Sequence, residues 1–137
     1  MKKIALSLIL SACISLAFAQ QQLASSTSLT SLSSKAGAFN WAETTFDFGK
    51  IQLNKPVTHE FTFVNNGDAP LVVTSVQASC GCTVTKYSKD PINPGAEGYV
   101  TATYNAAKAG IFTKTVTVNA NTEQGIVQLT IKGEVVE

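Results

Sequence analysis

The chain has 137 residues, of which 45% are hydrophobic and 14% charged, and its formal net charge is +1 at neutral pH. All ten basic residues are lysines, so the sequence lacks the guanidinium groups that usually clamp phosphates and nucleic acids. These values argue against a nucleic-acid-binding protein, and the chain is long enough to bury a single hydrophobic core.

The first 19 residues have the three parts of an export signal. Lys2 and Lys3 form a short basic region, residues 4–18 are apolar, and Ala17-Phe18-Ala19 has the small-x-small pattern that signal peptidase reads. The apolar run is shorter than the about 20 residues that a transmembrane helix needs. We therefore expect a signal peptide at 1–19 and a periplasmic or secreted protein without a membrane span. Cleavage would leave eight lysines against nine acidic residues, a net charge of −1.

Within this leader, Leu10-Ser11-Ala12-Cys13 matches the lipobox of bacterial lipoproteins. The apolar region ahead of Cys13 is short, and the apolar character continues after it to Phe18. One continuous apolar region favours simple cleavage. A lipoprotein anchored through Cys13 is the alternative.

Residues 20–38 are mostly Ser, Thr, Ala and Gln and include few large apolar side chains. Such a composition cannot bury a core, and we expect a flexible tether. The predicted organisation is therefore a leader at 1–19, a Ser/Thr-rich tether at 20–38 and one folded domain at 39–137.

After Phe39 the sequence changes to short segments rich in Thr and Val, in which apolar and polar residues alternate. This period of two residues predicts β-strands, and Gly, Pro, Asn and Asp mark the turns between them. Seven strands are predicted, at residues 44–48, 57–64, 71–78, 83–87, 99–104, 112–119 and 126–135.

The alternation also predicts which side chains face the core. The aligned apolar faces carry Val57, His59, Phe61 and Phe63 in one segment and Val127, Leu129, Ile131 and Val135 in another. Half-buried antiparallel strands give this pattern. About seven short strands over roughly 100 residues predict an all-β fold, an immunoglobulin-like antiparallel β-sandwich.

Several motifs give a resemblance to a known family. They are Phe46-Asp47-Phe48-Gly49, Glu60-Phe61-Thr62-Phe63-Val64-Asn65-Asn66-Gly67, Pro70-Leu71-Val72-Val73, Ala78-Ser79-Cys80-Gly81-Cys82-Thr83, Ile92-Asn93-Pro94-Gly95, Tyr104-Asn105 and Gly110. From Ala42 to its C-terminus the chain resembles the bacterial family called domain of unknown function 1573. It resembles more distantly the immunoglobulin-like domains of the major-sperm-protein, PapD and cilia-associated superfamily. The resemblance implies this fold, an exported setting and a scaffold or binding role, and it implies no established activity.

Cys80-Gly81-Cys82 contains the two cysteines that remain once the leader is removed. In a continuous strand, two residues of rise place the Cα atoms about 6.6 Å apart, at the long end of the range for a disulfide. A kink at Gly81, whose backbone is freer than that of other residues, would bring the sulfurs together. The small ring of such a disulfide is expected to be strained and easily reduced.

Three interpretations of this pair stay open. Two thiolates can hold a soft ion such as Cu(I) or Zn(II), but zinc needs three or four ligands and the exported chain adds only His59. A metal site at Cys80 and Cys82, with copper as its cofactor, is therefore one alternative, and a disulfide-exchanging pair is another. A structural turn with no cofactor is favoured, because the sequence shows no strongly positive or ligand-rich setting for these thiols. His59 is expected to be a partly buried strand residue rather than a ligand or a base.

The remaining motifs carry no chemistry in this context. Asp47-Phe48-Gly49 has the letters of a kinase metal motif, but without the other kinase motifs it predicts only a strand that ends at Gly49. Phe39 and Trp41 are expected to attach the first strand to the sandwich. The sequence has neither a Gly-x-Ser-x-Gly motif nor a Ser-His-Asp order, so no catalytic residue is predicted.

The sequence therefore predicts a non-enzymatic module that binds an envelope protein or component, or that is structural in the cell envelope. The edge strands of an open sandwich can accept a partner strand. We expect a monomer that binds no nucleic acid. The alternative is a periplasmic thiol site that binds Cu(I) or exchanges disulfides through Cys80 and Cys82.

Overall fold

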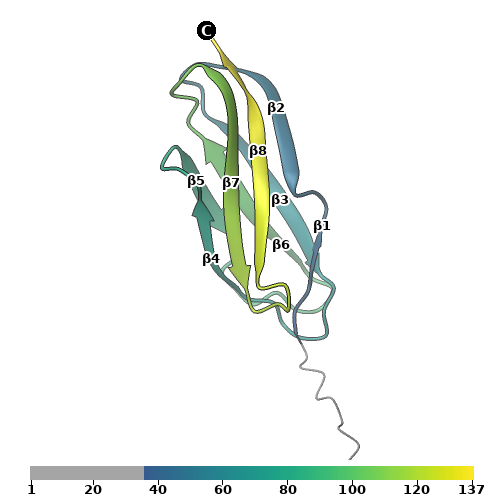
Figure 1. Cartoon of the computed structure of the whole chain (residues 1–137). Coiled ribbons are helices and arrows are strands. Elements are labelled where there is room, and N and C mark those ends of the chain that lie inside the picture. The colour runs from purple at the N-terminus through teal and green to yellow at the C-terminus, as the bar shows by residue number, and fades with distance from the viewer. Residues whose placement is uncertain (1–35) are drawn as a thin grey trace, which may run out of the picture. The chain divides into compact units, whose positions relative to one another are not determined.

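The computed structural model describes residues 36–137. For Val84 it describes only the backbone. The predicted leader, the Cys13 lipobox and the tether up to residue 35 lie outside the described residues. Eight strands form two four-stranded sheets (Figure 1). The first sheet has the order β1 (Phe39–Trp41), β3 (Val57–Asn65), β6 (Glu97–Tyr104), β5 (Thr83–Tyr87). The second has the order β2 (Thr45–Gln52), β8 (Ile126–Val136), β7 (Gly110–Ala120), β4 (Val73–Ala78).

The predicted fold class, an immunoglobulin-like β-sandwich, is confirmed. Each predicted segment coincides with a strand, and the eighth strand, β1, has three residues, which is too short for a period to show. The strand pairings are antiparallel except that of β2 with β8, which is parallel. Alternation within a strand does not reveal this exception, because both directions of pairing bury every second residue.

The core lies between the two sheets and includes apolar residues of the faces that the alternation predicted. Phe61 and Phe63 of β3 and Leu129 and Ile131 of β8 are each at most 1% exposed. Burying a side chain of this size stabilises the fold by about 1.5–3 kcal/mol before entropy is counted.

The predicted strand end at Gly49 is wrong, because β2 continues to Gln52. The pairing of β2 with β8 shifts register between Asp47 and Lys50, and Gly49 has φ +63°. Asp47 Oδ1 accepts a hydrogen bond of 2.8 Å from the Gly49 N–H. The strand therefore bulges at a glycine in the left-handed region instead of ending, and the bulge lets Ile51 enter the core.

Asn65, the last residue of β3, is a fully buried polar side chain. Its Oδ1 accepts from the N–H groups of Ala38 (3.1 Å) and Gly67 (2.9 Å). Its Nδ2 donates to the carbonyls of Ala69 and Ile92, both at 2.8 Å. One amide thus ties together two loops, the one between β3 and β4 and the one between β5 and β6, and the residue just ahead of β1.

The aromatic residues of β1 lie on the first sheet. The rings of Phe39 and Trp41 are stacked at 5.0 Å between centroids, and both pack on Phe63, at 4.8 and 4.7 Å. Phe39 is buried, and Trp41 is partly buried against the core. These contacts attach the short β1 to the sandwich.

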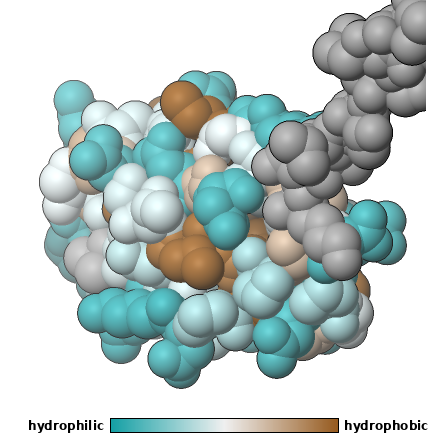
Figure 2. Space-filling view, turned by 90° about the horizontal axis from the view of Figure 1, so that it is seen from below, coloured by the Kyte–Doolittle hydropathy of each residue, from teal (hydrophilic) through white to brown (hydrophobic). Residues whose placement is uncertain are grey.

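Figure 2 shows the end of the sandwich at which β8 begins. The described residues of this face are mostly hydrophilic, with a small apolar area near the centre. Ile126, the first residue of β8, is 60% exposed. No helix in residues 36–137 is long and apolar enough to cross a membrane.

Candidate functional site

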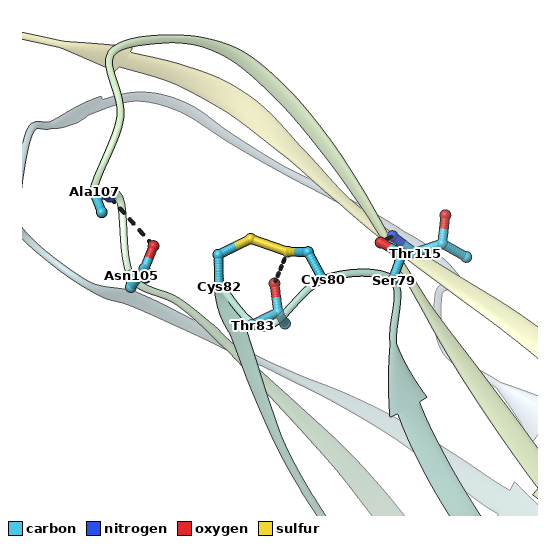
Figure 3. Close-up of a disulfide and its surroundings, with 7 residues drawn as sticks. All are labelled: Ser79, Cys80, Cys82, Thr83, Asn105, Ala107 and Thr115. Carbon is cyan, nitrogen blue, oxygen red and sulfur yellow. Dashed lines mark hydrogen bonds between the residues drawn. A yellow bond between two sulfur atoms is a disulfide. The ribbon is translucent and has the colours of Figure 1, made fainter.

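Both cysteines lie in the turn that carries the chain from β4 in the second sheet to β5 in the first (Figure 3). Cys80 and Cys82 are joined by a disulfide, and their Cα atoms are 5.3 Å apart. This separation is usual for disulfides and shorter than the about 6.6 Å of a continuous strand. The difference arises because residues 79–82 turn instead of extending β4.

Hydrogen bonds hold both ends of the turn. The Ser79 N–H donates to the Thr115 carbonyl of β7 at 2.8 Å, and the Thr115 N–H donates to Ser79 Oγ at 3.1 Å. At the other end the Asn105 N–H donates to the Cys82 carbonyl at 3.1 Å. The turn is therefore tied to the second sheet at one end and to the end of β6 at the other.

The turn closes on itself between Cys80 and Thr83. The Thr83 N–H donates to the Cys80 carbonyl at 3.3 Å, and Thr83 Oγ1 lies 3.8 Å from Cys80 Sγ. Gly81 at the tip is exposed, its φ is outside the left-handed region, and a Cβ there would meet no atom within 4 Å. The kink that brings the sulfurs together thus uses a backbone conformation that other residues adopt as well.

The chemistry of this site depends on its oxidation state. Cys80 and Cys82 are half-buried, and Cys82 packs against the core. Sulfurs joined in a disulfide offer no thiolate to act as a nucleophile or to hold a metal ion, so copper binding would first require reduction. In residues 36–137 no three His, Cys, Asp or Glu side chains are grouped so that they could hold a metal ion. Copper binding and disulfide exchange stay predictions.

His59 lies in an aromatic cluster on the core side of β3. Its ring stacks on Phe46 of β2 at 3.6 Å between centroids and meets Phe61 edge-on at 4.7 Å. Its Nε2 is 2.9 Å from Glu43 Oε1, without the alignment of a hydrogen bond, and its side chain is 16% exposed. The structure does not group His59 with the cysteines as a third ligand.

Sequence reasoning did not assign a role to the residues that hold the turn. In the sequence Ser79 stands within the motif around Cys80, and nothing near it points to Thr115. The contact spans 36 residues, because it follows from the pairing of β4 with β7. The one local indication of such a contact is a Ser or Thr at a strand end, because its hydroxyl can take the place of a backbone group as a hydrogen-bond partner.

The family model described as "Protein of unknown function (DUF1573)" matches residues 39–135, from the start of β1 nearly to the end of β8. The chain belongs to the DUF1573 family. The resemblance inferred from the motifs is confirmed. No curated protein sequence matches this DUF1573 protein.

Solved structures share the fold of this DUF1573 protein at low sequence identity. A protein of unknown function from Porphyromonas gingivalis W83 matches with a TM-score of 0.65 and 17% identity, over 73% of this chain and 47% of that one. The PapD-like domain 7 of human CEP192 matches with a TM-score of 0.62 and 7% identity, over 75% and 88%. The VesB protease of Vibrio cholerae matches with a TM-score of 0.58 and 14% identity, over 72% and 32%. The chain spans about half the length of the Porphyromonas protein, and these likenesses show the fold alone.

Proposed function

We propose that this DUF1573 protein is an exported, non-enzymatic module that binds another protein of the cell envelope through the edges of its sheets. The protein has an immunoglobulin-like fold and belongs to the DUF1573 family. Binding is the role that the family resemblance implies. An immunoglobulin-like sandwich hosts many functions, so the proposal depends on the surface and not on the fold.

The observation that carries the proposal is a pair of strand edges, on one side of the sandwich, that no other strand within residues 36–137 covers. β4 ends the second sheet and β5 ends the first, and Figure 1 shows both on the same side of the domain. Val76, Ala78 and Tyr87 on these strands are only partly buried where they pack against the core. Free edges offer unpaired backbone groups to a partner strand, and incompletely buried apolar side chains offer it contact area.

The protein is proposed to catalyse no reaction. The reactive thiols of Cys80 and Cys82 are closed in a disulfide, and the single histidine of the chain faces aromatic rings and a carboxylate. Neither arrangement supplies a nucleophile with a base beside it, which covalent catalysis needs.

The test is crosslinking of the full chain, with its own leader, in a bacterium that exports it. We expect the protein outside the cytoplasm, one discrete crosslinked envelope protein, and no turnover by the purified chain. Reproducible turnover that disappears in Cys80→Ser would overturn the non-enzymatic part. Recovery of the uncleaved protein from the cytoplasm alone would overturn the exported part.

A further inference from the structure

We infer that the edge of β5 is the binding site, and that it accepts an extended partner segment in which apolar and acidic residues alternate. This inference rests on the proposed binding function and adds a location and a partner chemistry to it. The segment would pair with β5 as a fifth strand of the first sheet.

Hydrogen bonds at the two ends of β5 show which of its backbone groups are used. The Asn105 N–H donates to the Cys82 carbonyl, and the Ser88 N–H donates to the Tyr99 carbonyl, both at 3.1 Å. Both pairs continue the antiparallel register of β5 with β6. In such a ladder, bonded residues alternate with residues whose N–H and C=O point away. Even-numbered residues of β5 are therefore bonded to β6, and odd-numbered ones point to the free edge.

Thr85 and Tyr87 are the odd-numbered residues at the centre and end of β5. Neither makes a backbone hydrogen bond with a described residue beyond the β5–β6 ladder. Their N–H and C=O groups thus form a row of donors and acceptors that a further strand would satisfy.

One lysine stands within β5 beside this row, and another follows just after the strand. Lys86 lies opposite Thr101 of β6 on the outer face, and both Lys86 and Lys89 are exposed. Within residues 36–137 neither lysine forms an ion pair. Asp90 is the one carboxylate among the residues that line the hollow at this edge. Glu97 lies beside Lys89 and Asp90 in the adjoining hollow, and Glu60 accepts a hydrogen bond from Thr101 on the side away from Lys86. A carboxylate on the added strand, directly across from Lys86, would give a favourable cross-strand pair.

The edge opens on a hollow of about 600 Å³. Its walls are formed by Thr85, Lys86, Tyr87, Lys89, Asp90 and Tyr99. Tyr99 is 40% exposed, and Tyr87 packs partly on the core. An added strand would send alternate side chains to its two faces, so acidic residues would meet the lysines and apolar ones would lie beside Tyr87.

A second copy of the chain fits the edge less well than a different partner. If the β5 edges of two copies paired antiparallel about a two-fold axis, Thr85 of one copy would lie opposite Tyr87 of the other. Lys86 would then lie opposite Lys86 of the second copy. Like charges directly opposite each other destabilise an antiparallel pair. The lysine therefore discourages self-pairing while it favours an acidic segment.

The test uses the purified full chain, labelled with ¹⁵N, and a synthetic nine-residue peptide of alternating valine and glutamate with blocked ends. A peptide with lysine in place of glutamate is the control. We expect the largest amide shifts at Thr85 and Tyr87, slower hydrogen exchange of these two amides, and binding at least about tenfold weaker for the lysine peptide.

Two variants with matched controls test the pairing and the charge separately. Thr85→Pro removes an N–H that β6 does not use, so the protein is expected to fold, and binding should be lost. Thr85→Val keeps the N–H and should bind as the parent does. Lys86→Glu should reverse the preference between the two peptides, whereas Lys108→Glu, the same charge change in the exposed loop after β6, should not.

In the experiments on the purified chain, four outcomes would overturn the inference. They are amide shifts centred away from β5, equal effects of Lys86→Glu and Lys108→Glu, unchanged binding by Thr85→Pro, and a dimer of the parent chain that Thr85→Pro dissociates. An envelope partner that crosslinks to Thr85→Pro as well as to the parent would place the site elsewhere and leave the proposed function standing. A parent chain that crosslinks to no partner would instead refute the proposed function itself.

Discussion

Replacement of Asn65 by alanine tests whether one buried amide holds the loop end of the sandwich together. Asn65 is fully buried, and its side chain makes four hydrogen bonds to backbone groups of 2.8 to 3.1 Å. Each such bond contributes about 1 kcal/mol net, and its loss leaves a backbone partner without its own partner. Since three of the four bonds are only partly buried, water can replace some of them in the variant. We expect the free energy of unfolding to fall by about 3 kcal/mol.

The measurement is equilibrium unfolding in urea, followed by the fluorescence of Trp41, the only tryptophan of the chain. For a domain of roughly 100 residues, 3 kcal/mol corresponds to a fall in melting temperature of about 12–24 °C. Asn66→Ala is the matched control, because that side chain is exposed, and its effect should stay within about 0.5 kcal/mol.

Asn65→Asp separates the hydrogen bonds from the packing. It keeps the size of the side chain but points a carboxylate oxygen at the carbonyls of Ala69 and Ile92, where the amide donated. We expect a loss at least as large as that of alanine at neutral pH, and a smaller one in acid, where the protonated carboxyl can donate again. A loss below about 1 kcal/mol for Asn65→Ala, with an unchanged urea slope, would refute the reasoning.

Three further predictions concern glycines, thiols and the leader. Gly98→Ala should destabilise the fold by about 1–3 kcal/mol, because the added Cβ would lie 2.5 Å from the Phe63 ring. Gly81→Ala should fold normally, because a Cβ there would meet no atom within 4 Å. Equal stabilities of the two variants in a thermal melt would contradict this prediction. If the site is structural, Cys80→Ser combined with Cys82→Ser should leave the copper content unchanged. Stoichiometric Cu(I) binding that only the parent shows would favour the thiol alternative. The intact mass of the exported protein should rise by about 2 Da on reduction, one disulfide, and should correspond to a chain without its first 19 residues; an added lipid mass on the leader cysteine would show the lipoprotein form instead.

The fold was predictable because its signals are local. In strands such as the one with Phe61 and Phe63, apolar and polar residues alternate, and turn residues separate the strands. The residues of each segment therefore predict its secondary structure and its buried face. The motifs around Cys80 then identified the family. Local patterns of this kind survive in any fold that keeps its strands half-buried.

Long-range contacts were not predictable from these signals. The bulge at Gly49 is a register shift in the pairing of β2 with β8, and that pairing joins segments that are far apart in the sequence. The cluster of His59 with Phe46 likewise joins strands of different sheets. In the sequence Asn65 directly follows the predicted strand 57–64, and only the packed structure surrounds its side chain with four backbone partners.

The sequence by itself therefore determined the strands, their core faces, the family and the presence of two cysteines one glycine apart. Only the tertiary structure decided that Ser79 and Asn105 fix the turn of these cysteines between two sheets. It also decided that no described residue takes up the outward backbone groups of Thr85 and Tyr87. The physical reason is that a strand's own residues set its alternation, whereas the neighbours that satisfy or leave free its backbone groups come from distant parts of the chain.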